Sequence, residues 1–329
     1  MNKNILQIVQ KKGFYQLEEI KLNKKIYINK AKENWVVDRF RSEWSQYNCK
    51  TSNSIYSKNV KIIWIIAPWT WRKLPTSRLN NKIVICTIHH IDEDKFDNEA
   101  KEEFYKRDKI IDAYHAISAS TKNQIQKLTD KKIYTMPFWV NQNIFTNLSN
   151  KLEIRKEYSI DEDAYLIGTF QRDTEGYDLK SPKLSKGPDR FLNLIDNMST
   201  QKENLQILLT GKRRNYLIEE LKKRKIKFYY HEMVDFETLN KLYNALDLYL
   251  VTSRYEGGPQ AILECGITRT PILSTRVGVA PEILNEKSIF NMDNFNKAEP
   301  DLDFAYNNAS KLGMPSGFKE FNKMFSDFL

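Results

Sequence analysis

The stretch Ser253–Leu284 reads SRYEGGPQAILECGITRTPILSTRVGVAPEIL and decides the fold that we predict for this chain. It follows Leu246–Thr252, an apolar run with the length and composition of a buried strand. A turn over Arg254–Gly258 leads into a helix that we expect to begin at Pro259, because proline suits the first turn of a helix. A second strand, Pro271–Thr275, and another turn follow. Such strand–turn–helix units are typical of α/β folds.

The turn before this helix carries groups that suit an anionic ligand. Gly257 and Gly258 let the backbone approach a ligand closely, and the helix behind them offers free amides and a positive dipole end to a phosphate. Glu256 lies in the turn and Glu264 follows eight residues later, about two helical turns on. Two carboxylates so placed reach opposite ends of one elongated ligand. The alternative is a solvated turn acid followed by an acid on a helix surface.

Short apolar runs alternate with helical patterns along the rest of the chain. The other runs are Lys25–Asn29, Val60–Ala67, Lys82–Ile88, Ala113–Ser118, Lys132–Met136, Tyr165–Phe170, Leu205–Thr210 and Lys227–Tyr230. Their apolarity is continuous rather than alternating, which marks strands covered on both faces. Amphipathic helices are predicted at Trp35–Gln46, Thr121–Leu128, Pro188–Met198, Tyr216–Arg224 and Phe236–Ala245.

This rhythm occurs twice and predicts an α/β protein with two Rossmann-like, doubly wound domains that face a cleft. The polar segment Asn147–Glu153 separates the two series. We therefore expect an N-terminal domain over residues 1–149 and a C-terminal domain over 150–310. In the last segment, 311–329, phenylalanines recur on one helical face that must be buried against something.

The charge balance is the main feature of the composition. The 329 residues carry a formal charge of +10 and a pI near 9.2. Such a surplus has three functional interpretations, namely nucleic acid, an anionic membrane surface or an acidic small ligand. The fourth is a bias towards Lys, Asn and Ile that carries no function. No zinc finger, KH, RRM or helix-turn-helix motif is visible and the lysines are spread along the chain, which argues against nucleic acid.

Cysteine usage and hydropathy predict a cytoplasmic protein. The three cysteines, Cys49, Cys86 and Cys265, are far apart and form no CxxC motif, so neither a disulfide framework nor a zinc site is indicated. No signal peptide is recognisable at the N-terminus. No apolar run approaches 18 residues, the length of a membrane-spanning helix.

The stretch Ser253–Leu284 resembles the signature of retaining glycosyltransferases of the GT-B fold, specifically glycosyltransferase family 4. Glu256 and Glu264 match the two acids of that family's Glu-x7-Glu motif. Two positions depart from the pattern, because Arg269 and Val279 stand where the family commonly has glycine. The match runs over about thirty consecutive residues, which makes it far more specific than a short glycine motif.

The resemblance extends backwards in separate patches. Ile85–His89 is similar to the family's segment with an N-domain active-site histidine, and Met136–Phe145 is similar to the linker between its domains. Gly168–Arg172 and Lys183–Pro188 resemble the pair of segments that binds the donor diphosphate, although the insertion between them is longer than usual. Phe228–Leu242 resembles the strand, loop and helix around the nucleobase. No glycine-rich loop is recognisable after the first strand.

The resemblance implies a metal-independent, retaining transfer of a hexose-type sugar from a UDP- or GDP-linked donor to a glycan or lipid-linked acceptor, without a cofactor. It implies that Glu264 binds the ribose, that Glu256 contacts the donor sugar, and that the final helix crosses back to the first domain. The catalytic residues that we expect are His89, Glu256, Lys186 and Arg172. The donor-binding residues that we expect are Glu264, Gly257, Gly258, Pro259, Gln260, Gly168 and Met233.

Two further sets of residues are candidates for other roles. Trp69, Trp71 and His90 follow strands at their carboxyl ends and are candidates for acceptor binding, with core packing as the alternative for the tryptophans. Three acidic triplets, Asp92–Asp94, Asp161–Asp163 and Asp301–Asp303, look like metal-binding motifs. The first lies away from the predicted donor site and the other two are interpreted as polar turn residues, so we predict no metal.

The basic N-terminal half suggests contact with an anionic membrane that carries a lipid-linked acceptor. The residues concerned are Lys21, Lys24, Lys25, Lys30, Lys32, Arg39, Arg72 and Lys73. The setting would then be polysaccharide, lipopolysaccharide or glycolipid assembly, with the protein peripheral on the inner face of the membrane.

The alternatives to an active transferase are a catalytically silent protein of the same fold and a basic nucleic-acid-binding protein.

Overall fold

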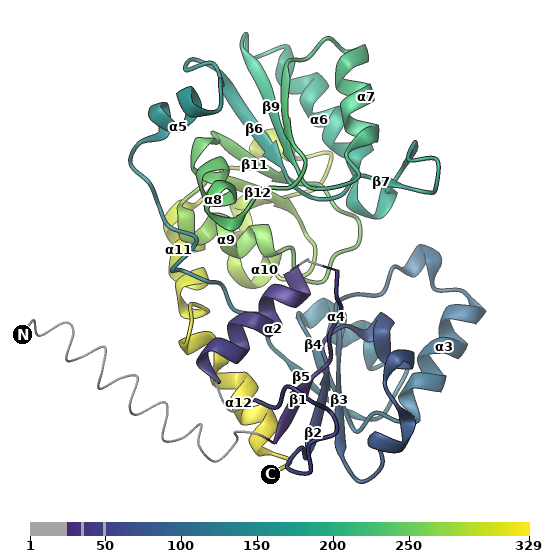
Figure 1. Ribbon diagram of the computed structural model, residues 1–329. Coiled ribbons are helices and arrows are strands. Elements are labelled where there is room, and N and C mark those ends of the chain that lie inside the picture. The colour runs from purple at the N-terminus through teal and green to yellow at the C-terminus, as the bar shows by residue number, and fades with distance from the viewer. Residues whose placement is uncertain (1–24, 34–35, 49–50) are drawn as a thin grey trace, which may run out of the picture.

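The computed structural model describes residues 25–33, 36–48 and 51–329, which form two lobes, each built on a parallel sheet (Figure 1). The first sheet follows the chain in the order β1-β2-β3-β4-β5, with every neighbouring pair parallel. Its strands are β1 (Ile26–Ile28), β2 (Ile62–Ile65), β3 (Ile83–Ile88), β4 (Ala113–Ala116) and β5 (Lys132–Thr135). β2 is buried along its whole length, as expected of a strand covered on both faces.

Helices cover both faces of this first sheet. The lobe contains α2 (Val36–Tyr47), α3 (Asn98–Asp108) and α4 (Ala119–Ile125), with 3₁₀ turns η1 (Pro68–Lys73), η2 (Thr76–Arg78) and η3 (Glu93–Lys95). Phe40 and Trp44 of α2 belong to the core on one face. Phe104 of α3 and Ile125 of α4 belong to the core on the other.

The second lobe has a doubly wound sheet of order β10-β9-β6-β11-β12-β13, again all parallel. Its strands are β6 (Tyr165–Thr169), β9 (Leu205–Thr210), β10 (Phe228–His231), β11 (Leu248–Val251), β12 (Ile272–Thr275) and β13 (Ile289–Phe290). Its helices are α5 (Lys151–Glu157), α6 (Pro188–Ser199), α7 (Asn215–Lys223), α8 (Phe236–Ala245), α9 (Gln260–Thr268), α10 (Ala280–Ile283) and α11 (Leu302–Lys311), with turns η4 (Leu184–Lys186), η5 (Glu286–Ser288) and η6 (Phe295–Lys297). A small hairpin, β7 (Thr174–Glu175) and β8 (Ser181–Pro182), projects from it.

The strand order of the second sheet reverses between β6 and β11. The chain moves outward from β6 through β9 to β10, and outward the other way from β11 through β12 to β13. Such a reversal leaves a crevice at the carboxyl ends of the two central strands, where open α/β sheets bind ligands. Among the described strands of the first sheet the order shows no such reversal.

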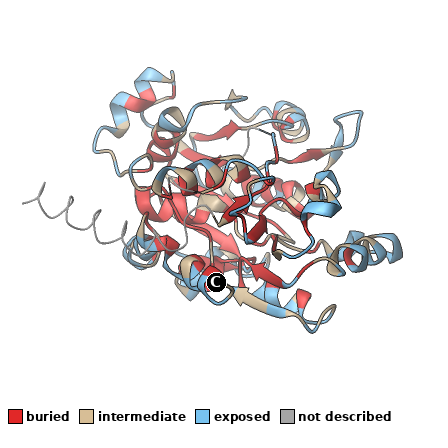
Figure 2. Ribbon diagram, turned by 60° about the horizontal axis from the view of Figure 1, so that its bottom comes forward, coloured by how far each residue is buried: buried red, intermediate tan, exposed pale blue. Residues whose placement is uncertain are grey.

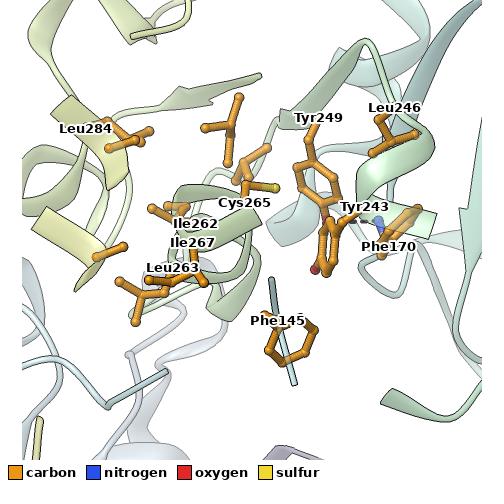
Figure 3. Close-up of a cluster of buried hydrophobic side chains, with 14 of the residues drawn as sticks. Phe145, Phe170, Tyr243, Leu246, Tyr249, Ile262, Leu263, Cys265, Ile267 and Leu284 are labelled. Carbon is orange, nitrogen blue, oxygen red and sulfur yellow. Dashed lines mark hydrogen bonds between the residues drawn. The ribbon is translucent and has the colours of Figure 1, made fainter. Parts of the chain in front are cut away.

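A hydrophobic core packs beneath the crevice of the second lobe. Tyr243 of α8 and Tyr249 of β11 lie beside Phe170, whose backbone amide donates to the Tyr249 hydroxyl at 2.9 Å (Figure 3). Leu263 and Cys265 of α9 are fully buried in the same cluster. The helix that follows the glycine turn is therefore fixed by its apolar face.

The end of the chain returns to the first lobe. After α11, the turn η7 (Ser316–Phe318) and α12 (Lys319–Ser326) run along the first lobe, drawn in yellow in Figure 1. Phe321 and Phe325 of α12 are fully buried against Trp44 and Trp64. Figure 2 shows buried residues concentrated in the sheets and in the helix faces against them.

The fold class is confirmed, and each predicted strand is present within a few residues. The helix predicted to begin at Pro259 begins one residue later, with Pro259 at its cap. Missing from the prediction were α3, α5, α11, the strand β13 and the β7–β8 hairpin. Residues 1–23 and Cys49 lie outside the described residues. Within the described part of the chain, no helix is long and apolar enough to cross a membrane.

Candidate functional site

Three loops meet at the reversal of the second sheet. They follow β6, precede α6 and follow β11. Gln171 joins them, because its side-chain amide donates to the Lys186 carbonyl at 2.9 Å and its side-chain oxygen accepts from the Ser253 hydroxyl at 3.1 Å. The three loops are thus held as one surface at the point where the topology predicts a ligand.

Lys186 and Glu256 form an ion pair at the centre of this surface. Their side chains are 14% and 16% exposed. Burial raises the pKa of Glu256, but the positive charge of Lys186 and its hydrogen bond act against burial and, with smaller contributions from other groups, hold that pKa below its usual range. Gly187 positions the lysine, since its φ of 65° is left-handed and a Cβ there would collide with the Thr252 carbonyl.

Further cations lie around the pair. Burial lowers the pKa of Lys183, and the charges of Lys186 and Arg172 lower it further. Burial also lowers the pKa of Arg172, with Arg213 as the next cause; the Arg172 Nε donates to the Thr174 carbonyl at 3.0 Å. Several positive charges that repel one another in a sheltered place are a natural site for an anion.

The first lobe adds two histidines. The Nε2 of His89 lies 2.9 Å from the Ile66 carbonyl, which makes that nitrogen the donor and leaves Nδ1 as an acceptor. Burial lowers the pKa of His89, and burial lowers the pKa of His90 to about 4 despite the nearby Glu256. Both imidazoles are therefore neutral at pH 7.

The glycine turn touches the first lobe directly. A Cβ at Gly257 would collide with the carbonyl oxygen of His89, and a Cβ at Gly278 would collide with the carbonyl of Gly257. Gly278 also has a left-handed φ of 50°. Glycine is required at both positions because three backbone segments pass there at close range. Val279 has an ordinary φ of −78° and needs no glycine.

Glu264 is buried and bound from both lobes. One carboxylate oxygen accepts from Arg39 of α2 at 2.8 Å and the other from the Tyr243 hydroxyl at 2.8 Å. Gln260, one turn earlier on α9, donates to the Trp139 carbonyl at 2.8 Å. The face of α9 that carries Gln260 and Glu264 therefore lies against the first lobe.

The carboxyl end of α9 explains one departure from the family pattern. Arg269 caps the helix with a left-handed φ of 55°, the conformation that favours glycine there. Its guanidinium pairs with Asp303 of α11 at 2.7 Å and lies 4.3 Å from the centre of the Tyr306 ring. These contacts hold an arginine at a strained position.

The remaining predicted residues lie in different surroundings, and not all of them are near the ion pair or the histidines. Trp69 is 51% exposed and its ring centre lies 5.6 Å from that of His89. Trp71 instead packs against the core on the α3 face and donates to Glu103 at 2.7 Å. Met233 is 48% exposed in the turn after β10.

Gly168 has a packing reason to be glycine. It lies inside β6, and a Cβ there would collide with the Leu246 side chain of the adjoining core. The structure therefore explains this glycine without a ligand.

The prediction of a basic face that includes Arg39 is wrong at that residue. Arg39 is 8% exposed and paired with Glu264 in the interior, so it adds nothing to a surface charge. Arg72 is exposed but paired with Glu103. Lys21 and Lys24 lie outside the described residues.

The acidic triplet after β3 serves as a contact between the lobes. Asp94 accepts from the Tyr255 hydroxyl at 3.1 Å. Within the ranges that the structure describes, no three His, Cys, Asp or Glu side chains are grouped as a metal site would need.

Sequence reasoning missed several residues of this site. Lys183 lies three positions before Lys186, within the segment Lys183–Pro188 that resembles a diphosphate-binding segment. This short spacing could have identified Lys183 as a residue of the same site. Gln171 lies between two predicted residues in the same way. No local signal pointed to Arg39, which is 225 residues away from Glu264 in the chain.

Comparison with known proteins gives a family match within the second lobe and several solved structures with a similar fold. Residues 179–298 match the model of the family described as Glycosyl transferases group 1. This segment contains Lys183, Lys186, Glu256 and Glu264. A search of curated proteins finds no match to the chain.

Solved glycosyltransferase structures are similar to this one in architecture. HepE of Anabaena, in complex with UDP-glucose, is 11% identical with a TM-score of 0.64, over 92% of this chain and 98% of that one. Sucrose-phosphate synthase of Thermosynechococcus elongatus is 14% identical with a TM-score of 0.63, over 88% and 75%. A glycosyltransferase from Rickettsia africae is 18% identical with a TM-score of 0.60, over 91% and 83%. At these identities the likeness shows the fold, and the chain has the two-lobed GT-B architecture.

Proposed function

We propose that this protein transfers a sugar from a nucleoside-diphosphate sugar to a glycan or lipid-linked acceptor. The observation that carries the proposal is the Lys186–Glu256 pair. It lies at the reversal of the second sheet, beside the start of α9 and inside the segment that matches the glycosyl transferase family. A cation, a carboxylate and a helix N-terminus together suit a sugar joined to a diphosphate.

The basic groups would stabilise the leaving group. When the bond between the sugar and the diphosphate breaks, negative charge grows on the phosphate oxygen that departs. Lys186, Arg172 and Lys183 are placed to neutralise it, together with the amides at Gly258–Gln260. As the diphosphate takes up Lys186, Glu256 becomes free to accept hydrogen bonds from the hydroxyls of the donor sugar.

The rest of the donor would lie along α9 towards α8. We assign Glu264 to the ribose hydroxyls and the turn at Met233 to the nucleobase. Support for a uridine nucleotide comes from two similar structures, HepE with UDP-glucose and pneumococcal GtfA with UDP and GlcNAc. A GDP-linked donor is the alternative.

We infer a retaining, metal-independent transfer of a hexose-type sugar. The bond from the anomeric carbon to the phosphate oxygen breaks, and the acceptor hydroxyl oxygen bonds to that carbon on the same face. The acceptor proton passes to the departing phosphate oxygen. His89 would act as a neutral hydrogen-bonding group next to the transferred sugar, because burial keeps its pKa low.

The acceptor would enter from the first lobe. Trp69 is a half-exposed ring close to His89, and such a ring offers an apolar face on which a sugar can stack. Trp71 is held by Glu103 and by the core on the α3 face, so we give it no part in acceptor binding.

The test is a panel of ligands measured by thermal stabilisation. UDP, GDP, their common sugar conjugates, UMP and a short oligonucleotide are each added to the full chain. We expect at least one nucleoside diphosphate to raise the melting temperature more than UMP does, since the cations are placed for a diphosphate. Stabilisation by the oligonucleotide alone would contradict the proposal and would favour a nucleic-acid-binding protein.

A further inference from the structure

Arg39 lies between two carboxylates, one on each lobe. Its Nη2 donates to Glu264 of α9 at 2.8 Å, and its Nε lies 3.7 Å from Glu43 of its own helix. The three side chains are 6%, 6% and 5% exposed. Figure 1 shows α2, which carries Arg39 and Glu43, as a helix of the first lobe with one end near the second lobe.

The guanidinium is enclosed by aromatic rings as well as by acids. Its central carbon lies 5.1 Å from the ring centre of Phe236, 5.3 Å from that of Phe145 and 5.7 Å from that of Phe40. Phe236 begins α8, directly after the turn that contains Met233. Arg39 thus fills the space between Glu264 and the start of α8, where the proposed function places a nucleoside.

Both carboxylate oxygens of Glu264 already accept a hydrogen bond, and the Arg39 guanidinium occupies the side that faces the start of α8. Arg39 takes one oxygen and Tyr243 the other, both at 2.8 Å. A ribose that lies between Glu264 and the start of α8 needs the volume that the guanidinium fills. The nucleoside and Arg39 therefore compete for this enclosed space, in which the guanidinium lies against three aromatic rings.

Glu43 offers Arg39 a second position. The Arg39 Nε has no hydrogen-bond partner although it is buried, and it already faces Glu43 one helical turn away. Glu43 is fixed in place, since it accepts from Trp139 at 2.8 Å and from Asn141 at 3.0 Å. A shift of the guanidinium towards Glu43 would satisfy the Nε and keep the positive charge paired, which a buried charge requires.

We propose that Arg39 is a gate on the donor site, which moves from Glu264 to Glu43 when the nucleoside enters. The inference rests on the proposed function, which places the ribose on Glu264. It assigns to α2 a contact that ties the two lobes together until the donor replaces it. Part of the donor's binding free energy is then used to release this contact.

The gate predicts effects of opposite sign for two neighbouring substitutions. Arg39→Met keeps the apolar stem and removes the competitor, so the affinity for UDP or GDP should rise by about fivefold or more. Glu43→Gln removes the charge that receives Arg39, so the affinity should fall by a similar factor. A purely structural role would weaken binding in both variants.

The measurement is isothermal titration calorimetry of the full chain with UDP and with GDP. Lys95→Met is the matched control, because Lys95 forms an exposed ion pair with Glu175 across the two lobes and should leave the affinity unchanged. If Arg39→Met does not fold, Glu43→Gln still decides, since unchanged or tighter binding there would overturn the gate.

The possible failures are distinguishable. If wild type binds a nucleoside diphosphate and Arg39→Met binds it equally or more weakly, the gate is wrong and the proposed function stands. If neither protein binds one, the proposed function fails and the gate fails with it. Binding by Arg39→Met alone would support the gate in its strongest form.

Discussion

His115 shows how a single buried imidazole links folding to pH. Its Nε2 lies 2.9 Å from the Met136 carbonyl and must donate to it, so Nδ1 accepts from the Thr87 hydroxyl at 3.0 Å. The Thr87 oxygen in turn accepts from the indole of Trp64 at 2.8 Å. Burial lowers the pKa of His115 to about 3. The neutral form is the one that this chain of hydrogen bonds accommodates.

We expect acid to destabilise the protein partly through this residue. Below about pH 6.5 the unfolded chain binds a proton on His115, whereas the folded chain does not until about pH 3. Stability conferred by the neutral ring is therefore complete above pH 6.5 and is lost as the pH falls towards 3. His115→Gln should flatten the fall in unfolding free energy by up to about 1.4 kcal/mol per pH unit.

Urea denaturation at a series of pH values measures this slope. His231→Gln is the control, because His231 is less deeply buried and should alter the slope less. Carboxylates titrate in the same range but are common to all variants. A slope for His115→Gln identical to that of wild type would refute the assignment.

Individual residues were predictable where the signal is local. Glu256 and Lys186 were singled out from motifs in their own segments, and the structure pairs them. Whether they act on a donor sugar stays a prediction. The partner of Glu264 was not predictable, because Arg39 reaches it only where α2 of the first lobe meets the second lobe.

Among the helices and strands, the sequence predicted those that bury enough apolar residues to form a recognisable pattern. The strands of three residues or more are continuous apolar runs and were all expected, whereas the two-residue strand β13 was not. By contrast, α3 (NEAKEEFYKRD) buries only Phe104, so no apolar stripe marks it. The β7–β8 hairpin has two residues per strand, too few for a periodic signal. The phenylalanine spacing of α12 predicted a buried face, which it has.

We expect α12 to be a structural part of the first lobe. Phe321 is fully buried, with its ring centre 5.7 Å from that of Phe138 and 5.2 Å from that of Trp139. Phe321→Ala should therefore cost about 3–5 kcal/mol of stability, as large-to-small changes in a core do. Phe304→Ala on α11, where the ring is 41% exposed, should cost less than about 1 kcal/mol.

Tryptophan fluorescence during urea denaturation measures the unfolding of the first lobe, which contains α12 in its core. All six tryptophans precede residue 150 in the sequence. An unchanged midpoint for Phe321→Ala would mean that α12 is not needed by the first lobe.

At the scale of the molecule, the two lobes are joined around the candidate site. The Ala119 amide of the first lobe donates to Glu282 at 2.8 Å, and Gln260 of the second lobe donates to the Trp139 carbonyl at 2.8 Å. The same crevice contains the Lys186–Glu256 pair. Part of the positive charge of the chain is thus internal, since Lys186 is paired within the crevice and Arg39 is buried against Glu264.

Under the proposed function, this crevice breaks the bond between a sugar and a nucleoside diphosphate. The most direct measurement is the rate of nucleoside diphosphate release from a panel of nucleotide sugars, with Lys186→Ala, Glu264→Ala and the exposed control Lys222→Ala compared with wild type. We predict release by wild type and by the control. We also predict a loss of more than about tenfold, roughly 1.4 kcal/mol, in each of the other two variants. Wild-type rates in both Lys186→Ala and Glu264→Ala would show that this crevice is not the site of sugar transfer.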